Sequence, residues 1–471
     1  MKTELAAHPT FAIVGHPNKG KSSIVATLSE DDSVAISADP GTTRVARSFR
    51  MRIDDRVLYE LFDTPGFQRP RAVLEWLLAH ERGADTRADV VREFIVAHAD
   101  EERYRNEVEL LKPILAGAGV LYVVDGAHPY GAEYEPEMEV LRWTGQPRMA
   151  LINMIGDGDH MEEWRRALNQ YFSIVRVFDA QRADFSKRLE LLRAFRELGE
   201  GDDRFGAALE RAVDVLQADR RARRRRAAEE ITDLMNDVLT WREIAPVPDG
   251  ADQAALVKAL SERLMTRVRK REQAARRLVQ DLYHHSAVET HERAVDVLAE
   301  DLFSERSFVV FGLSTKQLAM TGAATGAVAG GVIDVAAGGA SLLLGAGIGA
   351  LIGGIGAVFG ANRLAKVQVL GAPMGGMQLQ VGPITTPNFP WVMLGRALLH
   401  HRLIAERNHA RREALVVDAI SDTHLSEAIA PDIRNRMARA FKRIRDEGGL
   451  SALDREQLCA DIEGSLESKL R

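Results

Sequence analysis

The sequence is poor in cysteine and aromatic residues, and it has no excess of positive charge. Its single cysteine, Cys459, excludes an intramolecular disulfide framework and a cysteine-rich metal site, and favours a reducing compartment. With 62 basic and 68 acidic residues the formal net charge is -6, which does not suit a chain that coats nucleic acid. The first ten residues lack the basic stretch and apolar run of a secretory signal, so we expect a cytoplasmic location.

The first 200 residues have the pattern of an α/β domain. A chain of 471 residues is expected to form two or three domains. Short apolar runs alternate here with helical or loop stretches, which predicts a mostly parallel sheet with flanking helices. Residues 68–117 are rich in Ala, Glu, Arg and Leu and predict a helical insertion. The expected strands are FAIV, VARSFRMRID (an edge strand), VLYELF, GVLYVVD, RMALIN and FSIVRVF.

The octapeptide GHPNKGKS, residues 15–22, follows the first expected strand and precedes a helical run. Glycines at Gly15 and Gly20 allow the backbone to fold around an anion, so that N–H groups and a helix N-terminus point at phosphate oxygens. Lys21 is then expected to neutralise the β and γ phosphates, and the Ser22 hydroxyl to bind Mg²⁺. The remaining expected nucleotide-binding residues of this loop are Asn18, Lys19 and Ser23.

Two further stretches fit the same phosphate chemistry. The run VLYELF ends in DTPG, where Asp63 can hold Mg²⁺ and Gly66 can offer its N–H to the γ phosphate. Between the two motifs, DPGTTR places Thr42 and Thr43 on a polar loop that could close over the metal. Each stretch alone is also an ordinary turn, but their order and spacing predict a nucleotide site.

These residues resemble the P-loop GTPases of the TrmE, Era and EngA group, whose signatures look like GxPNxGKS, GTTR and DTPG. The resemblance covers about the first 180 residues and implies a GTP-operated switch with Mg²⁺, in which Lys21, Thr43 and Gly66 serve hydrolysis. Asn18 matches the asparagine with which some members of the group hold K⁺; a turn-forming asparagine is the alternative. Phe67 follows DTPG, so the water-orienting glutamine of Ras-like enzymes is absent and we expect slow hydrolysis.

The base-reading motif departs from that group. Where Asn-Lys-x-Asp is expected, the chain reads NMIGDGD, with Asn153 in place but Met154 for the lysine and Gly156 for the aspartate. That aspartate accepts hydrogen bonds from guanine, and a buried donor left unpaired costs about 1 to 3 kcal/mol. Asp157 or Asp159 could substitute if the loop shifts. Guanine selectivity therefore stays open.

Residues 201–471 predict a mainly α-helical domain with an unusual apolar segment. Residues 318–362 carry one ionisable side chain, Asp334, and two series of glycines at a spacing of four. Such small-residue faces allow close helix packing, and a hairpin with arms at about 318–333 and 340–361 is expected. We expect the hairpin to associate with a membrane, and a buried soluble core is the alternative. FGLSTKQLA, residues 311–319, resembles the uncharacterised C-terminal domain of a bacterial GTPase family.

Three functions remain open at this point. The first is a slow Mg²⁺-dependent GTPase switch that binds GTP and GDP and acts with a lipid or protein partner at the inner face of the plasma membrane. The second is a soluble Era-like GTPase in RNA modification or ribosome assembly, which a helical half without a β-rich RNA-binding pattern makes weaker. The third is a nucleotide-binding scaffold that does not hydrolyse. The arginine run in DRRARRRRAAEE, residues 219–230, could contact acidic lipids or RNA, but a solvated helix face is expected.

Overall fold

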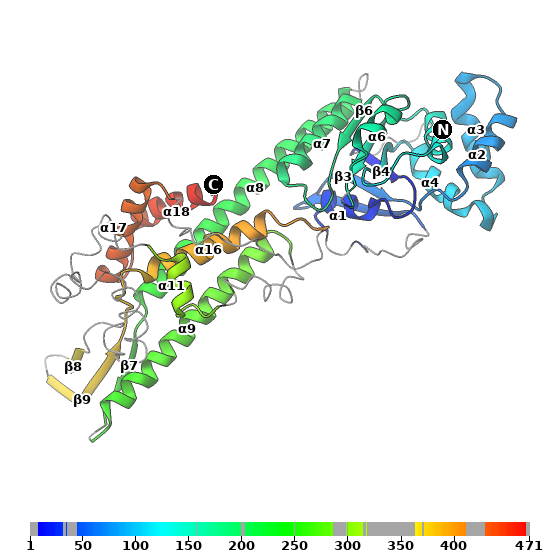
Figure 1. The fold of residues 1–471 in the computed structure, drawn as a ribbon. Helices are drawn as coiled ribbons and strands as arrows, with labels where there is room; N and C mark the ends of the chain where they lie inside the picture. The colour runs from blue at the N-terminus through cyan, green and yellow to red at the C-terminus, as the bar shows by residue number, and fades with distance from the viewer. Residues whose placement is uncertain are drawn as a thin grey trace. The chain divides into compact units, whose positions relative to one another are not determined.

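The computed structural model describes residues 8–31, 34, 45–156, 158–198, 203–248, 250–285, 298, 300–313, 317, 363–369, 372–410 and 429–467. The chain divides into two compact units. Unit 1 comprises residues 1–220 and 406–412, and unit 2 comprises residues 221–405 and 413–471. Each unit is described below by itself, with the labels of Figure 1.

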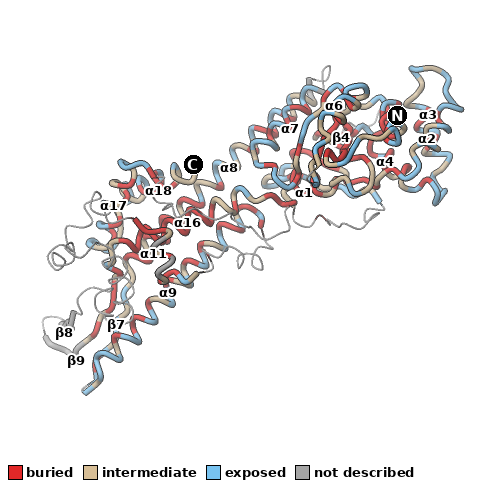
Figure 2. The backbone as a smooth tube through the Cα atoms, viewed as in Figure 1, coloured by how far each residue is buried: buried red, intermediate tan, exposed pale blue. Residues whose placement is uncertain are grey.

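Unit 1 is built on a six-stranded sheet in the order β2-β3-β1-β4-β5-β6. The strands β1, β3, β4, β5 and β6 pair in parallel, and β2 pairs antiparallel to β3. β2 lies at the edge of the sheet, as its alternating sequence predicts. The central strand β4 is buried along its whole length (Figure 2). The strand bounds are β1 Thr10–Val14, β2 Arg47–Ile53, β3 Arg56–Asp63, β4 Gly119–Asp125, β5 Arg148–Asn153 and β6 Ile174–Val177.

Helices cover both faces of this sheet, and successive β1 side chains show why. Phe11 and Ile13 enter one apolar core with α1, α7 and the start of α8, whereas Ala12 and Val14 enter another with α2 to α6. The helices are α1 Lys21–Ser29, α2 Pro70–Ala79, α3 Arg87–Ala97, α4 Arg105–Leu115, α5 Glu135–Trp143, α6 Met161–Leu168, α7 Phe185–Leu198 and α8 Asp203–Thr240. The fold class predicted for this part is confirmed.

A short segment from late in the sequence completes unit 1. Asn408 is buried and its Nδ2 donates to the carbonyl of Ala183 at 2.9 Å. The hydroxyl of Thr27 on α1 lies 2.7 Å from Asn408 Oδ1 and 2.8 Å from the carbonyl oxygen of Ala180. Ala410 belongs to the same apolar core as α1 and α7. The segment is therefore an integral part of the packing on this side of the sheet.

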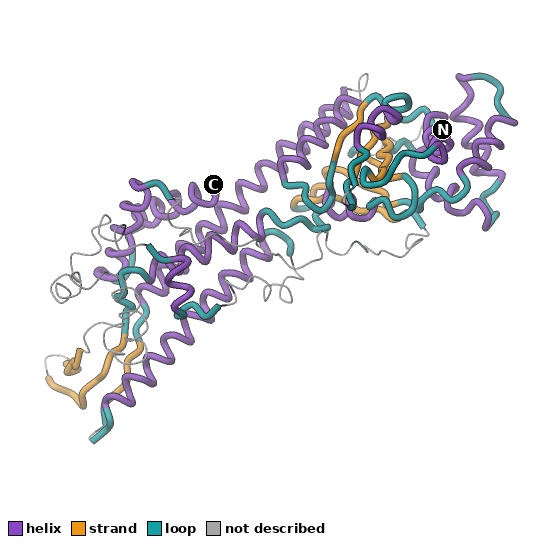
Figure 3. The backbone as a smooth tube through the Cα atoms, viewed as in Figure 1, coloured by secondary structure: helices purple, strands orange, loops and turns teal. Residues whose placement is uncertain are grey.

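Unit 2 is mainly helical, as predicted, and it also contains a small antiparallel sheet (Figure 3). Its strands lie in the order β7-β9-β8, with β7 Glu243–Pro246, β8 Arg363–Val369 and β9 Ala372–Val381. The sequence analysis did not anticipate this sheet. The helices are the part of α8 from residue 221 onward, α9 Gln253–Leu282, α11 Glu305–Phe311, α16 Phe389–Ala405, α17 Pro431–Glu447 and α18 Ala452–Glu467.

The arginine run on α8 is engaged by carboxylates of α18 and does not form a purely solvated face. Arg225 lies 2.7 Å from Glu456 and 3.3 Å from Glu463, and Arg224 lies 3.1 Å from Glu467. Exposed ion pairs of this kind contribute little stability singly, about 0 to 1 kcal/mol, and more when they form a network. Residues 318–362, where the glycine-rich hairpin is expected, lie outside the described residues. Within the described part of the chain, no helix has the length and apolarity needed to cross a membrane.

Candidate nucleotide-binding site

The loop after β1 needs glycine at two positions. Gly15 has φ +140°, and a Cβ there would meet the carbonyl oxygen of Val123 at 2.4 Å. Gly20 has φ +81°, and a Cβ there would meet Asn153 Nδ2 at 2.2 Å. Larger residues would be strained in this conformation and would clash with β4 or β5. The backbone therefore wraps tightly at the N-terminus of α1, where N–H groups favour an anion.

Lys21 is held back against this loop. Its Nζ donates to the carbonyl oxygens of Gly15 at 3.1 Å and His16 at 2.9 Å, and the residue is only 8% exposed. Burial lowers the pKa of Lys21 to about 8, although the carboxylates of Asp63 and Glu137 act in the opposite direction. An ammonium group that has lost its water is a strong partner for phosphate oxygens, which would replace the two carbonyls.

Ser22 and Asp63 form an oxygen pair beside Lys21. The Ser22 hydroxyl, from the first turn of α1, donates to Asp63 Oδ2 at 2.9 Å, and Asp63 at the end of β3 is buried. A hydroxyl and a carboxylate this close are hard oxygen donors, the type that Mg²⁺ prefers when phosphates and water complete its shell. The two residues therefore fit the Mg²⁺ site that the sequence predicts.

The segment that follows Asp63 packs directly against the loop. A Cβ at Gly66 would meet the Pro17 ring at 2.7 Å, so a glycine is needed for this approach. Phe67 is fully buried in the apolar core on the α2 to α6 side. Glu107 of α4, itself fully buried, accepts the N–H groups of Gln68 at 2.8 Å and Arg69 at 2.6 Å. A residue of the expected insertion thus fixes the chain just past the DTPG motif.

The base-reading region is tied to the phosphate loop through Asn153. Its Nδ2 donates to the carbonyl of Lys19 at 3.2 Å and its Oδ1 accepts from the N–H of Ala180 at 3.1 Å. Lys19 Nζ lies 3.9 Å from Asp125, which the sequence analysis did not single out although it ends β4. Asp159 Oδ1 accepts the N–H of Met161, the first residue of α6, at 3.3 Å.

Most of the residues predicted for the site come together at the carboxyl ends of β1, β3 and β5. They are Gly15, Asn18, Lys19, Gly20, Lys21, Ser22, Ser23, Asp63, Gly66 and Asn153. Asn18 is exposed with φ +61°, a conformation in which asparagine is enriched and which suits the turn-forming alternative. Thr43 and Asp157 lie outside the described residues. The functional assignment of the whole set remains a prediction.

One group at this site was missed by sequence reasoning. His16 Nδ1 lies 2.9 Å from Glu137 Oε1, and the Tyr122 hydroxyl donates to Glu137 Oε2 at 2.9 Å. His16 and Glu137 are 121 residues apart, so no local motif joins them. A histidine inside the octapeptide was the single available signal.

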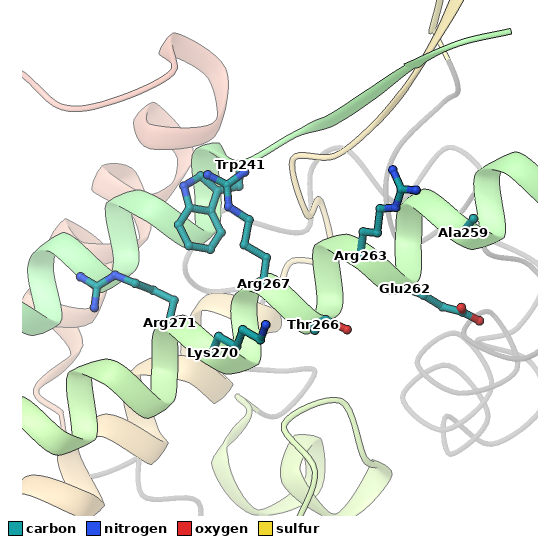
Figure 4. A pocket seen from close by; sticks show the side chains of 8 residues that line it. All are labelled: Trp241, Ala259, Glu262, Arg263, Thr266, Arg267, Lys270 and Arg271. Carbon is teal, nitrogen blue, oxygen red and sulfur yellow. The ribbon is translucent and has the colours of Figure 1, made fainter.

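An open hollow in unit 2 is lined by Trp241 and side chains of α9 (Figure 4). Its volume is about 690 Å³, and several of the lining residues are basic. The Arg267 guanidinium lies 4.0 Å from the centre of the Trp241 ring, and Arg271 pairs with Glu230 and Asp237. These two arginines are occupied by groups of unit 2 itself, and the hollow lacks the glycine cradle of the phosphate loop.

Two family models match the chain, each over a different part of the sequence. Residues 165–463, more than half of the chain, match the family described as Domain of unknown function (DUF3482). The chain belongs to the DUF3482 family. Residues 10–154 match the family described as 50S ribosome-binding GTPase. The N-terminal part of this DUF3482 protein is therefore a P-loop GTPase domain, and the predicted resemblance is confirmed.

The curated relatives match a limited part of the chain. GTPase Der from Agathobacter rectalis is 38% identical over 87 residues, or 18% of this chain and 20% of that protein. The tRNA modification GTPase MnmE from Gluconacetobacter diazotrophicus is 36% identical over 121 residues, or 24% of this chain and 27% of that protein. The chain thus spans about a fifth to a quarter of the length of these two relatives. Among solved structures, Era from Aquifex aeolicus bound to GDP and AlF4⁻ is 16% identical with a TM-score of 0.30, covering 51% of this chain and 72% of that one.

Proposed function

We propose that the chain binds GTP with Mg²⁺ and hydrolyses it slowly, so that it works as a nucleotide-operated switch. The observation that carries this proposal is the gathering of Lys21, Ser22 and Asp63 at the N-terminus of α1, beside a loop that accepts no Cβ at Gly15 or Gly20. Charge complementarity to a triphosphate and the match to a GTPase family support it.

The residues have distinct tasks in this proposal. The loop N–H groups and Lys21 bind the β and γ phosphates, since a desolvated ammonium interacts strongly with them. Ser22 and Asp63 would hold Mg²⁺, which neutralises phosphate charge when bound. Gly66 offers its backbone N–H to the γ phosphate, and Thr43 would be a further Mg²⁺ ligand. Catalysis here rests on positioning and electrostatics, and Phe67 in place of a glutamine makes turnover slow.

The site is expected to select GTP over ATP only weakly. Gly156 has no carboxylate for the guanine N1–H and amino groups, and that contact is worth about 1 to 3 kcal/mol. We therefore expect GTP to be preferred over ATP by less than the roughly 5- to 150-fold that such a contact supplies. Competition of ATP against a fluorescent GTP analogue measures this ratio. A preference for GTP that reaches this range would show that Asp157 or another group replaces the missing aspartate.

The test of the main proposal is nucleotide binding and phosphate release by the full chain. Asp63→Asn should weaken Mg²⁺-dependent GTP binding at least about tenfold, because one anionic ligand becomes neutral. Asp54→Asn is the matched control, since Asp54 is exposed in the β2–β3 turn at φ +51° and should leave binding unchanged. Binding without phosphate release would instead support the non-hydrolysing scaffold. A wild-type chain that binds neither GTP nor ATP would refute the proposal.

K⁺ is a further part of this proposal. Asn18 would hold the ion beside the phosphates, where it adds positive charge. Hydrolysis should then be faster in KCl than in NaCl at equal ionic strength, and Asn18→Ala should abolish the difference. Equal rates in both salts would leave Asn18 as a turn residue.

We also propose that the switch acts at the inner face of the plasma membrane. This part rests on the sequence of residues 318–362, whose glycine-rich apolar run suits helix packing in lipid. Fractionation of cells followed by high-salt and alkaline carbonate washes tests it. Retention in the membrane pellet through both washes is the expected result, and recovery in the soluble fraction would overturn it.

A role in RNA modification or ribosome assembly is the second candidate. The favouring observation is the match of residues 10–154 to the family described as 50S ribosome-binding GTPase. Sedimentation of a cell extract through a sucrose gradient, with GTP or a non-hydrolysable analogue, distinguishes it. Co-migration with ribosomal subunits in the GTP-bound state would favour this function over the membrane.

A further inference from the structure

One side-chain amide joins the phosphate loop to the loop between β6 and α7, residues 178–184. Asn153 Nδ2 donates to the carbonyl oxygen of Lys19 at 3.2 Å, and Asn153 Oδ1 accepts the N–H of Ala180 at 3.1 Å. The β6–α7 loop follows β6 at the same edge of the parallel sheet at which β5 ends in Asn153. Ligands of such sheets bind beyond the carboxyl ends of the strands. The β6–α7 loop therefore borders the expected place of the nucleoside.

Asn408 holds the other side of the β6–α7 loop. Its Nδ2 donates to the carbonyl oxygen of Ala183 at 2.9 Å, and its Oδ1 lies 2.7 Å from the hydroxyl oxygen of Thr27 on α1. The same hydroxyl lies 2.8 Å from the carbonyl oxygen of Ala180. Asn408 thus reaches the loop directly at Ala183 and through Thr27 at Ala180. As a result, Ala180 is held between Asn153 at its N–H and Thr27 at its carbonyl oxygen.

The orientation of the Asn408 amide is fixed by its neighbours. Its Oδ1 also accepts the N–H of Ala410 at 2.9 Å, and a backbone N–H can only donate. The carbonyl oxygen of Ala183 can only accept, so Nδ2 has to face it. Asn408, Thr27 and Ala180 are all buried, and a buried polar group that loses its partner is costly. Asn408 is therefore a fixed link, with a donor on one side and an acceptor on the other.

The nucleoside end of the site depends on few groups. Gly156 offers no carboxylate to a base, and Asn153 is the predicted nucleotide-binding side chain among the described residues of the base-reading region. Asn153 keeps its orientation through its two bonds, and one of them goes to Ala180. A shift of the β6–α7 loop would remove that bond. The Ser22 to Asp63 contact at the phosphate end does not involve this loop.

We propose that Asn408 is a positioning residue for the nucleoside end of the nucleotide site. It holds the β6–α7 loop against α1, and the loop in turn keeps Asn153 beside the phosphate loop. The inference rests on the proposed binding of GTP. Asn408 follows shortly after Ala405, where α16 ends, so a segment that continues from unit 2 contributes to the site in unit 1.

This arrangement gives the nucleotide an effect on residues 406–410. If the docking of this segment tightens GTP binding, bound GTP holds the segment in place by the same factor, because coupling between two binding equilibria is reciprocal. Occupancy of the nucleotide site is thereby passed to the segment that leads out of α16.

The decisive experiment measures the dissociation constant of a fluorescent GTP analogue for the full chain, with and without Mg²⁺. Asn408→Ala should weaken binding about three- to tenfold, the effect of one lost orienting hydrogen bond. Thr27→Val keeps the branched shape without the hydroxyl and should weaken binding to a similar extent. Thr27→Ser keeps the hydroxyl and should bind like the wild type. The ratio of the affinities with and without Mg²⁺ should not change, because Ser22 and Asp63 keep their contact.

Tyr59→Phe is the matched control for a general loss of stability. The Tyr59 hydroxyl donates to the carbonyl oxygen of Leu28 on α1, and both residues lie in the apolar core that contains Ala180. The variant removes one buried hydrogen bond from α1 and leaves the contacts of Asn408 in place. It should lower the melting temperature but keep the wild-type affinity for GTP. All variants are compared at a temperature where circular dichroism shows that they are folded.

Hydrogen exchange gives a second measurement that a purely stabilising role would not affect in this pattern. In the nucleotide-free chain, the β6–α7 loop should exchange faster in Asn408→Ala and Thr27→Val than in the wild type or Tyr59→Phe. Addition of GTP should slow exchange in residues 406–410 of the wild type.

Two outcomes overturn the inference. If Asn408→Ala and Thr27→Val are folded and bind GTP like the wild type, Asn408 positions nothing for the nucleotide. If Tyr59→Phe loses as much affinity as Asn408→Ala, the loss comes from general loosening of the core. A wild-type chain that binds no nucleotide would instead refute the proposed function, and faster exchange of the β6–α7 loop in Asn408→Ala would still show that Asn408 positions this loop.

Discussion

The buried lysine of the phosphate loop should make the nucleotide-free protein less stable than its neutral variant. Burial lowers the pKa of Lys21 from 10.5 to about 8. One pKa unit corresponds to about 1.36 kcal/mol, so holding the charged ammonium in this place costs about 3 kcal/mol near neutral pH. The folded chain binds fewer protons than the unfolded chain between these two values. Its stability should therefore rise with pH from about 8 to 10.5 and fall as pH drops back through 8.

Lys21→Met isolates this effect, because methionine keeps a similar length without the charge. The variant loses two hydrogen bonds to loop carbonyls, which offsets part of the gain at neutral pH. Methionine has no proton to lose, so the pH dependence of the difference reports on Lys21 alone. The free energy of unfolding of the wild-type chain, relative to Lys21→Met, should grow by about 2 kcal/mol between pH 7 and pH 9.5.

Urea denaturation of the nucleotide-free chain at several pH values gives this difference. Hydrogen exchange in peptides from β1 and β4 assigns the transition to unit 1. Lys112→Met on α4 is the control for loss of a lysine from the surface of unit 1, since its side chain is 52% exposed. A constant difference for Lys21→Met would refute the reasoning, because it would mean that the Lys21 ammonium keeps its water in the folded state.

Three further predictions concern the packing of Gly15 and Asn408 and the accessibility of the Cys459 thiol. Gly15→Ala should lower the free energy of unfolding of unit 1 by about 1 to 3 kcal/mol in a urea titration, since the new Cβ meets the carbonyl of Val123. Gly464→Ala is the control: this residue lies in open space on α18, so the change should be neutral or slightly stabilising. Asn408→Ala should speed hydrogen exchange in α1 by an amount that corresponds to about 1 to 3 kcal/mol, because the Thr27 hydroxyl and the Ala183 carbonyl lose their hydrogen bonds to Asn408. Unchanged exchange would contradict the packing of this segment. Burial raises the pKa of Cys459, so a thiol reagent should modify it slowly in the folded chain and fast in urea; equal rates would show an accessible thiol.

The parts of the fold that the sequence predicts are those set by short-range patterns. Strands such as GVLYVVD are continuous apolar runs, and the octapeptide joins a strand to a helix, so both are visible locally. The hairpin of β8 and β9 was missed because its sequence follows a glycine-rich apolar run and lacks the usual turn signal of Asn-Gly or Asp-Gly. The partners of Arg224 and Arg225 were missed for a related reason. Their carboxylates lie more than 200 residues further along the chain.

The same limit applies to the site, and it explains which of its residues escaped prediction. Lys21, Ser22 and Asp63 belong to motifs whose spacing is set by one strand-loop-helix unit. Glu137 and Asn408 act through contacts that only the folded chain creates. Glu137 reaches His16 from α5, and Asn408 contacts Thr27 of α1 across 381 residues of sequence. A buried carboxylate or amide with partners distant in sequence carries no local signature. Residues that orient other residues are for that reason found by geometry.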